Sequence, residues 1–364
     1  MRAAPASLLL GFLICLAGSP RIAAATELSL FPPASDAAHF FSGTASDASP
    51  PSPRLFRSSP WRLGPAPDLR DLPEELAGAS DAPAGPGPAP APKLFTRGTT
   101  FVTAGVLVAM TAWAALGVEK DDYNAFFVQR EKFFGKNTYA GGADKCSHFI
   151  LSAFLARELT WVYEKQGHSR DQSLALSLGV TILSGVIQEV GDGFTPYGYA
   201  WEDIVADTLG GITGAALTRY ELNDLIGLRF GFVPNDVPDD PCCAESLGDN
   251  YAKEVYSGDL KLAGLAKRMH FNPGPARFLM LSATYSTKGY GFDPARPDRQ
   301  RNVGIDVGLN MPEILSAVGV PENTWWGVIL YKGLNLLRVP FTAVGIRYDL
   351  NHKKWHGPDT GNGF

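Results

Sequence analysis

Four apolar stretches between residues 101 and 218 limit most strongly what this chain can fold into, because each has the length and composition of a helix. The first and third carry no charge, and the fourth is apolar apart from Asp207 and contains three glycines that suit close helix packing. Lengths of 15 to 18 residues fit either short membrane spans or a bundle buried in water. We favour a four-helix, membrane-associated bundle formed by Phe101–Val118, Cys146–Tyr163, Gln172–Gln188 and Ile204–Thr218.

Charges in the loops favour a four-pass arrangement, with the loop after the first helix on the cytoplasmic side. Apart from Lys145, which enters the second helix, that loop holds four cations, whereas the loop after the second helix holds two. The four are Lys120, Arg130, Lys132 and Lys136, and the two are Lys165 and Arg170.

The chain changes character after Phe232, where a run rich in Pro, Asp and Asn indicates turns. Beyond it, Arg277–Ser286, Arg301–Asn310 and Phe341–Leu350 alternate apolar with small or polar residues, as half-buried strands do. Trp325–Leu337 has the pattern of a short amphipathic helix. The alternation also fits a membrane barrel, but a barrel needs at least eight strands of about ten residues, and three or four are found here. The sequence therefore predicts an α+β fold with a small antiparallel sheet.

The N-terminal quarter contains targeting and spacer sequence. Residues 1–25 have the charge, the apolar core and the Ala-rich cleavage site of a secretory signal. Residues 26–97 are rich in Pro and Ala and have too little apolar material to form a core, so they are expected to be a disordered spacer. We expect the helical bundle within 98–232 and a β-rich region within 233–364.

Composition excludes several classes of protein. Lys and Arg total 32 against 37 Asp and Glu, and no basic stripe occurs, which argues against a nucleic-acid partner. Four cysteines without Cys-x-x-Cys spacing exclude a disulfide scaffold and a cysteine zinc site. No P-loop, dinucleotide fingerprint or nucleophile elbow is present, so the motifs name neither a reaction nor an organic cofactor.

Ionisable residues gather at the ends of three of the predicted helices. Within each group, spacings of three or four residues place side chains on one helix face. In an up-down bundle the start of the second helix, the end of the third and the start of the fourth lie at one end. We therefore expect a shared pocket that binds a divalent metal or holds an acid and a base. The metal candidates are Asp144, His148, Glu189, Asp192, Asp203 and Asp207, the catalytic candidates are His148, Glu189 and Asp207, and Lys145 and Glu202 lie beside them.

Each of these residues also has a purely structural interpretation. Asp144 and Asp203 stand where helix caps are common, and a single histidine near a helix start is usually a hydrogen-bonded core residue. Asp207 is the exception, because a carboxylate one turn inside an apolar helix is costly without a partner. Lys145 is its simplest expected partner.

The same residues carry a resemblance to a known family. Asp144-Lys145-x-x-His148, a Glu189 before a turn, and Trp201-x-Asp203-Ile204-x-Ala206-Asp207-x-x-Gly210 resemble the YfiM-like family of periplasmic lipoproteins and, more distantly, the VanZ-like membrane family. The resemblance implies an exported envelope protein of unassigned biochemistry. The lipid-bearing cysteine that it also implies is not evident around Cys15, which follows Phe12-Leu13-Ile14.

Three functions fit these residues and patterns. The first is a non-catalytic envelope component whose acidic and histidine residues tie the helices together. The alternative is a metal-dependent or acid–base enzyme acting on a lipid-linked or cell-wall substrate. The third is a binder of lipid or of a cell-wall precursor between helices. In each, the membrane is an expected partner.

Overall fold

The computed structural model describes residues 94–116, 124–232, 251, 254–290 and 299–359, which belong to one compact unit. The expected signal sequence and nearly all of the expected spacer lie outside the described residues. So do the turn-rich run after residue 233 and part of the loop between the first and second predicted helices.

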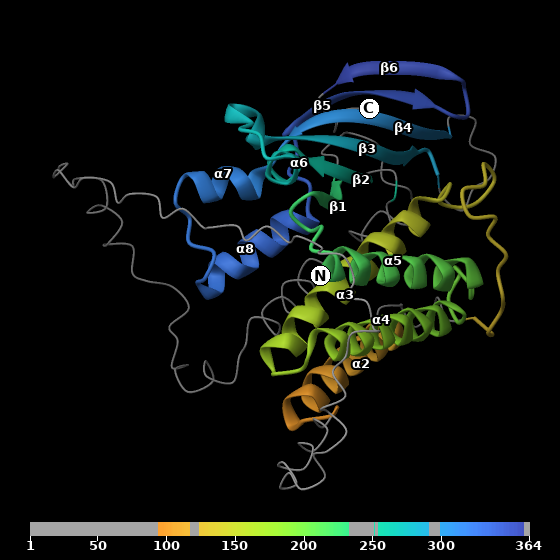
Figure 1. Cartoon of the computed structure of the whole chain (residues 1–364). Coiled ribbons are helices and arrows are strands. Elements are labelled where there is room, and N and C mark those ends of the chain that lie inside the picture. Colours follow the sequence, from red (N-terminus) through yellow and green to blue (C-terminus); the bar gives the residue numbers. More distant parts are fainter. Residues whose placement is uncertain (1–93, 117–123, 233–250, 252–253, 291–298, 360–364) are drawn as a thin grey trace, which may run out of the picture. The chain divides into compact units, whose positions relative to one another are not determined.

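Four helices form where the sequence predicts them (Figure 1). They are α2 (Arg97–Leu116), α3 (Ala143–Lys165), α4 (Arg170–Asp192) and α5 (Trp201–Arg219). A short turn joins α3 to α4, and Ser169 caps the start of α4 in a capping box closed by Gln172. Helix α4 packs against the three others.

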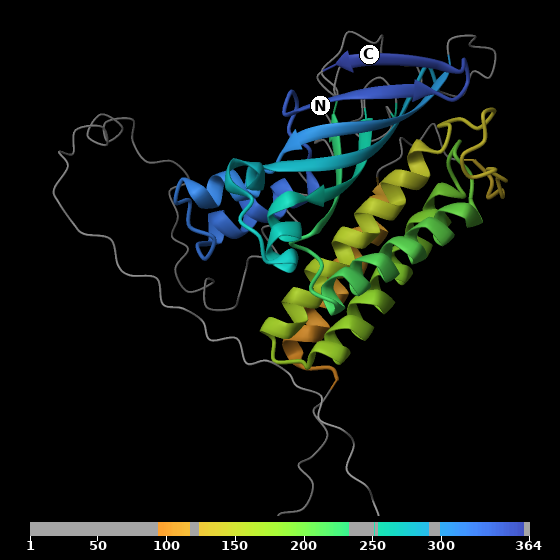
Figure 2. The ribbon, with the colours of Figure 1, turned by 45° about the horizontal axis from the view of Figure 1, so that its top comes forward.

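Helices α3 and α5 run in the same direction and lie side by side in both views (Figures 1 and 2). Gly210 and Gly214 of α5 make this packing close, because a Cβ at either position would overlap a main-chain carbonyl of α3, that of Phe149 or of Ala153. The two helix starts therefore meet at one end of the bundle.

Helices α2 and α4 are the two described helices that are long and apolar enough to cross a membrane. α3 and α5 differ from the four-pass expectation: they are not among the candidate spans, and each buries charged residues inside the protein, such as Lys145 and Glu158 on α3 and Asp203 and Asp207 on α5. α2 is the less buried of the two candidates, with 11% of its apolar window inside the protein against 33% for α4.

A six-stranded antiparallel sheet follows the bundle, in the simple order β1 to β6. The three strands predicted from alternation are present as β3 (Leu279–Lys288), β4 (Gln300–Leu309) and β5 (Ala343–Asp349). Three strands were not expected: β1 (Ile226–Phe232), which precedes residue 233, β2 (Glu254–Lys261) and β6 (Lys354–Asp359). The predicted helix is α8 (Trp325–Leu336), and α6 (Leu262–Met269), the 3₁₀ turn η5 (Gly274–Phe278) and α7 (Met311–Ala317) complete the described elements.

The sheet buries its polar side. Arg229 on β1 donates to Asp259 on β2 at 2.6 Å between Nε and Oδ2, and both side chains are almost fully buried. Asp306 on β4 pairs with Arg338, and Arg347 on β5 lies beside it. The expected half-buried sheet is therefore present with its polar residues inside.

Helix α3 joins the two regions. Phe149 and Ile150 of α3 share an apolar core with Leu228 and Tyr256 of β1 and β2. The Tyr285 hydroxyl of β3 donates to the carbonyl of Gly141, just before α3. The sheet therefore holds the segment that leads into the polar end of the bundle.

Candidate functional site

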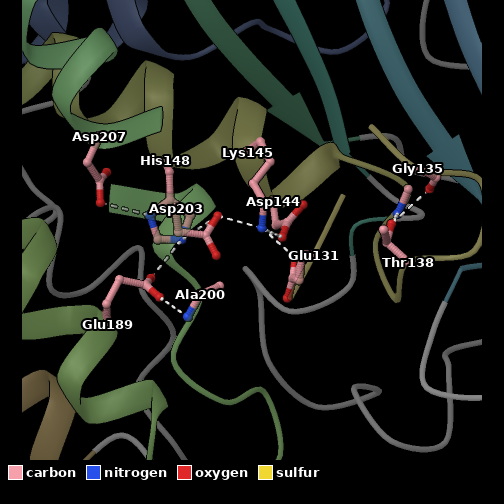
Figure 3. A network of polar contacts seen from close by, with 11 residues as sticks. Glu131, Gly135, Thr138, Asp144, Lys145, His148, Glu189, Ala200, Asp203 and Asp207 are labelled. Atoms are coloured by element: carbon pink, nitrogen blue, oxygen red, sulfur yellow. Dashed lines mark hydrogen bonds and ion pairs between the residues drawn. The ribbon is translucent and has the colours of Figure 1, made fainter. Parts of the chain in front are cut away.

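A buried group of charged side chains lies where the starts of α3 and α5 meet the end of α4 (Figure 3). All but His148, whose side chain is 10% exposed, are at most 6% exposed. We call this group the acidic cluster; its members are Glu131, Asp144, Lys145, His148, Glu189, Asp203 and Asp207.

One half of the acidic cluster surrounds the ammonium group of Lys145. Lys145 Nζ donates to Asp144 Oδ2 at 2.7 Å and pairs with Glu131 from the loop before α3. It also lies 2.7 Å from Asp203 Oδ1 on α5. This half therefore already contains a cation.

The other half is built around His148, one turn further along α3. His148 Nδ1 lies 3.1 Å from Asp207 Oδ2. Asp207 Oδ1 accepts a 2.6 Å hydrogen bond from the hydroxyl of Ser152. On the opposite side of the ring, His148 Nε2 faces Glu189 Oε1 at 3.7 Å and Asp203 Oδ1 at 4.0 Å.

Glu189 is held in place by one of its two oxygens only. Its Oε2 accepts a hydrogen bond from the main-chain N–H of Ala200 at 3.1 Å. Its Oε1 is buried and makes no hydrogen bond among the described residues, and this is the atom that faces His148. Such a buried acceptor is costly to leave unpaired, so the position suits a proton or a cation.

The number of carboxylates explains the electrostatics of the acidic cluster. Five carboxylates face one ammonium and one imidazole, which leaves three negative charges if every group is ionised. Burial and the neighbouring Asp144 raise the pKa of Glu131 to about 9. Burial raises the pKa of Glu189 to about 8, although His148 opposes the change. The excess charge is therefore relieved by protons unless a cation is bound.

The imidazole responds in the same way. Burial lowers the pKa of His148, but Asp207 and Asp203 outweigh burial and raise it well above its usual value. Burial also raises the pKa of Asp203, against the effect of His148. For Asp144, burial is outweighed by Lys145, which lowers the pKa of this carboxyl.

An apolar cavity of about 430 Å³ lies next to the acidic cluster, between α3, α5 and strands β1 to β3. Phe149, Leu209, Leu228 and Tyr256 are among its lining residues. Lys145 lines the cavity too, so its side chain connects an apolar space with the charged groups.

Most of the residues predicted from the sequence come together. The convergence expected for Asp144, His148, Glu189, Asp203 and Asp207 is confirmed by the distances among them. Asp192 remains outside both groups of potential metal ligands, at the half-buried end of α4, where its charge acts on Glu189. Glu202 is buried beside Asp203 but belongs to neither group.

Two expectations about individual residues are wrong. Lys145 does not pair with Asp207, because the parallel packing of α3 and α5 places Lys145 level with Asp203 and His148 level with Asp207. Asp144 and Asp203 are not helix caps: Gly142 and Ala200 hold those positions, without a side-chain cap bond. Both carboxylates instead face Lys145.

Sequence reasoning missed Glu131 and Ser152. Glu131 stands between Arg130 and Lys132 in a loop without periodicity, where a charged residue is expected to be solvated. Ser152 follows His148 by four residues, and this helical spacing was the available signal.

One family model matches the chain, over residues 130–224, and its description is predicted periplasmic lipoprotein (DUF2279). No curated protein and no solved structure gives a significant match. The matched segment begins just before Glu131 and ends just after α5, so it contains every member of the acidic cluster. This helical segment therefore matches the predicted periplasmic lipoprotein family, as its motifs suggested, and the protein is an exported component of the cell envelope.

Proposed function

We propose that this envelope protein has a non-catalytic, structural role in which His148, Glu189 and Asp203 bind one divalent cation that ties α3, α4 and α5 together. The observation that carries the proposal is the buried, unpaired Oε1 of Glu189, which faces His148 Nε2. The facing oxygen of Asp203 completes a group of three ligand atoms within 4.8 Å of one another.

The spacing of the three ligand atoms supports this proposal. Metal–ligand bonds of 2.0–2.2 Å in a tetrahedral site separate the ligands by roughly 3.3–3.6 Å. The separations of 3.7 and 4.0 Å from His148 Nε2 need only a small contraction to reach that range. The other group of potential ligands, Glu131, Asp144 and Asp203, surrounds the ammonium of Lys145, and Asp203 is shared between the two groups.

The contacts behind His148 also support a metal. A histidine that binds a metal through one nitrogen usually donates its other N–H to a carboxylate, which fixes the ring and its tautomer. Asp207 lies 3.1 Å from His148 Nδ1 and is itself held by Ser152. One imidazole with two carboxylates is a ligand set that suits Zn²⁺ or Mn²⁺.

The direct test is to measure the metal content of the purified full-length protein after dialysis, with a thermal melt before and after Zn²⁺ or Mn²⁺ is added. We expect about one cation per chain. At a free cation concentration about 100 times the Kd, binding adds about 2.7 kcal/mol to the free energy of unfolding. For a folded region of this size that corresponds to a rise in Tm of roughly 5–10 °C.

The variant Glu189→Gln distinguishes loss of cation binding from loss of the fold. Glutamine resembles the protonated acid, so the metal-free Tm of this variant is expected to stay close to that of the wild type, while the rise with metal disappears. Glu164→Gln, at a half-exposed position of the same bundle, is the matched control and is expected to keep the rise. A wild-type protein that retains no cation and shows no change in Tm with either metal contradicts the proposal.

A second candidate, a metal-dependent enzyme acting on a lipid-linked substrate, is favoured by the apolar cavity that shares Lys145 with the acidic cluster. There an apolar chain would lie beside a bound cation that could activate a water molecule. A growth test in cells that require this protein distinguishes the structural role from the enzymatic one. If Glu189→Gln is as abundant and as stable in the envelope as the wild type and still fails to restore growth, the enzyme is favoured.

A further inference from the structure

The outward side of strands β3 to β5 is an exposed aliphatic surface. We call it the aliphatic face. Antiparallel pairing places Leu281, Val307 and Val344 side by side across the three strands, and Ile305 beside Ile346. The side chains that form it are 38% to 59% exposed: Leu281, Val303, Ile305, Val307, Leu309, Val344 and Ile346.

The polarity of these strands is the reverse of that of a sheet on a water-soluble core. A soluble antiparallel sheet turns its apolar side inward and its polar side to water. Here the alternate positions, which carry Asn302, Asp306 and Arg347, are buried and the aliphatic positions are outside. Burying charged groups is costly even when they are paired. A sheet with polar residues inside and aliphatic residues outside is favourable when its outer side faces an apolar medium.

Charge is missing from the aliphatic face between its two ends. On β3 from 279 to 285, β4 from 303 to 309 and β5 from 344 to 348, every outward side chain is aliphatic or tyrosine. The first outward cation is Arg301, beyond the end marked by Tyr348 and Trp355, whose rings lie 5.1 Å apart. At the other end, Phe341 is 67% exposed.

These features match the lipid side of membrane strands. Such strands have 9–11 residues, and their apolar band ends in aromatic residues at the membrane surface. β3 and β4 have 10 residues each. At about 3.4 Å per residue, Val303 to Leu309 spans roughly 20 Å along the strand, which at a usual tilt covers part of a band about 25 Å tall.

A protein partner fits the aliphatic face less well. Protein–protein interfaces carry about one hydrogen bond per 100–200 Å², with a polar rim and a centre enriched in Arg and aromatic residues. Between its ends the outward side of these strands offers aliphatic side chains and the tyrosines Tyr285 and Tyr348, but no charged side chain. The same side of the sheet continues through Ala283 and Gly258 into the apolar cavity beside α3 and α5, so the apolar surface does not stop at β3.

We propose that the aliphatic face lies against the hydrocarbon of an envelope membrane. This proposal is independent of the acidic cluster and of any bound cation.

Nitroxide labels on the full-length protein test whether the aliphatic face contacts lipid. Ile305→Cys and Val344→Cys are made in a chain whose four native cysteines are replaced by Ser, and Lys267→Cys on α6, where the side chain is 77% exposed, is the control. The proteins are mixed with vesicles of phosphatidylethanolamine and phosphatidylglycerol. Collisions of each label with oxygen, which concentrates in lipid, are compared with collisions with a water-soluble nickel complex.

We expect vesicles to raise oxygen collisions and lower nickel collisions several-fold at residues 305 and 344, with little change at 267. Nickel access that persists at residue 305 while the protein floats with the vesicles overturns the proposal, because another element, such as α2, then makes the attachment. Labels shielded from both reagents before lipid is added also overturn it. In that case light scattering identifies what covers the aliphatic face. A doubled mass indicates a second copy of the protein, and an unchanged mass indicates another part of the same chain.

Discussion

At the scale of single residues, Lys145 has the most demanding environment, since its ammonium group is buried among Glu131, Asp144 and Asp203. Removing one partner of a buried ion pair is far more damaging than removing an exposed one, because the remaining charges stay in a medium of low polarity. Lys145 is therefore a structural requirement whether or not a metal is bound.

Lys145→Met keeps the length of the side chain and removes its charge. We expect this change to lower the free energy of unfolding by about 3–5 kcal/mol, the usual cost of an unpaired buried charge. Urea unfolding measures it. Lys165→Met, at the exposed end of the same helix, is expected to change stability by less than about 0.5 kcal/mol. Equal effects of the two substitutions would show that the buried ion pairs contribute little.

The acidic cluster also makes stability depend on pH. The folded-state pKa values of Glu131 and Glu189 are raised to about 9 and about 8, and that of His148 is raised as well. The folded protein therefore binds more protons than the unfolded chain above about pH 4.5, the ordinary pKa of glutamate, and His148 adds to this excess above about pH 6.5. A state that binds more protons loses stability as the pH rises.

We therefore expect the metal-free protein to become less stable from about pH 4.5 to 9, as measured by urea unfolding in the presence of a chelator. With Zn²⁺ or Mn²⁺ present the trend is expected to weaken or reverse, because metal ligands bind best when deprotonated. Stability that rises with pH in the chelated protein would contradict the assignment of the excess protons to these groups.

Much of the acidic cluster could be predicted from the sequence, because its residues lie at helix ends with regular spacing. The pairing within it could not. Whether Lys145 meets Asp203 or Asp207 depends on the relative height of α3 and α5, which two glycines set through backbone contact. Glu131 gave no periodic signal, since it comes from a loop held by other parts of the chain.

At the scale of elements, the contact between α3 and α5 is the critical one. Gly210→Ala places a methyl group against the carbonyl of Phe149, so the helices must separate and His148 moves away from Asp207. We expect a loss of about 1–3 kcal/mol in unfolding free energy, as for other overpacked cores. Gly179→Ala on α4, where a Cβ has open space, is the control and is expected to stabilise the helix by up to about 1 kcal/mol. Thermal melts of both variants make the comparison.

The predicted elements were those with a clear apolar period. Helices α2 to α5 and strands β3 to β5 have one, and the structure confirms them. β2 does not, because Glu254, Asp259 and Lys261 are charged residues that the structure buries. Alternation also locates a strand without showing which of its two sides is buried. In this sheet the polar side is the buried one.

At the scale of the whole folded region, a few polar contacts connect the sheet to the loop that carries Glu131. The Tyr285 hydroxyl bonds to the carbonyl of Gly141, and Arg301 bonds to that of Phe134. Arg299 and Tyr290 bond to the carbonyls of Thr138 and Lys136. The sheet therefore supports the acidic cluster without contributing a charged group to it.

Tyr285→Phe tests this support. Loss of one hydrogen bond costs about 0.5–1.5 kcal/mol. We expect amide hydrogen exchange to become faster from residue 131 to 142, while exchange in the middle of α4 stays unchanged. Tyr348→Phe, on the outward side of β5, is the control and is expected to leave the loop protected. An unchanged loop in Tyr285→Phe would show that the apolar core alone holds it.

The parallel packing of α3 and α5 also matters for how an exported chain reaches its folded form. His148 and Asp207 are 59 residues apart in sequence, and α4 lies between them. A chain that crosses the membrane from its N-terminus releases α3 well before α5. Lys145 can meet Glu131 and Asp144 as soon as α3 has emerged, whereas His148 has no carboxylate partner from α5 until Asp203 and Asp207 follow. We therefore expect the half of the acidic cluster around His148 to form last.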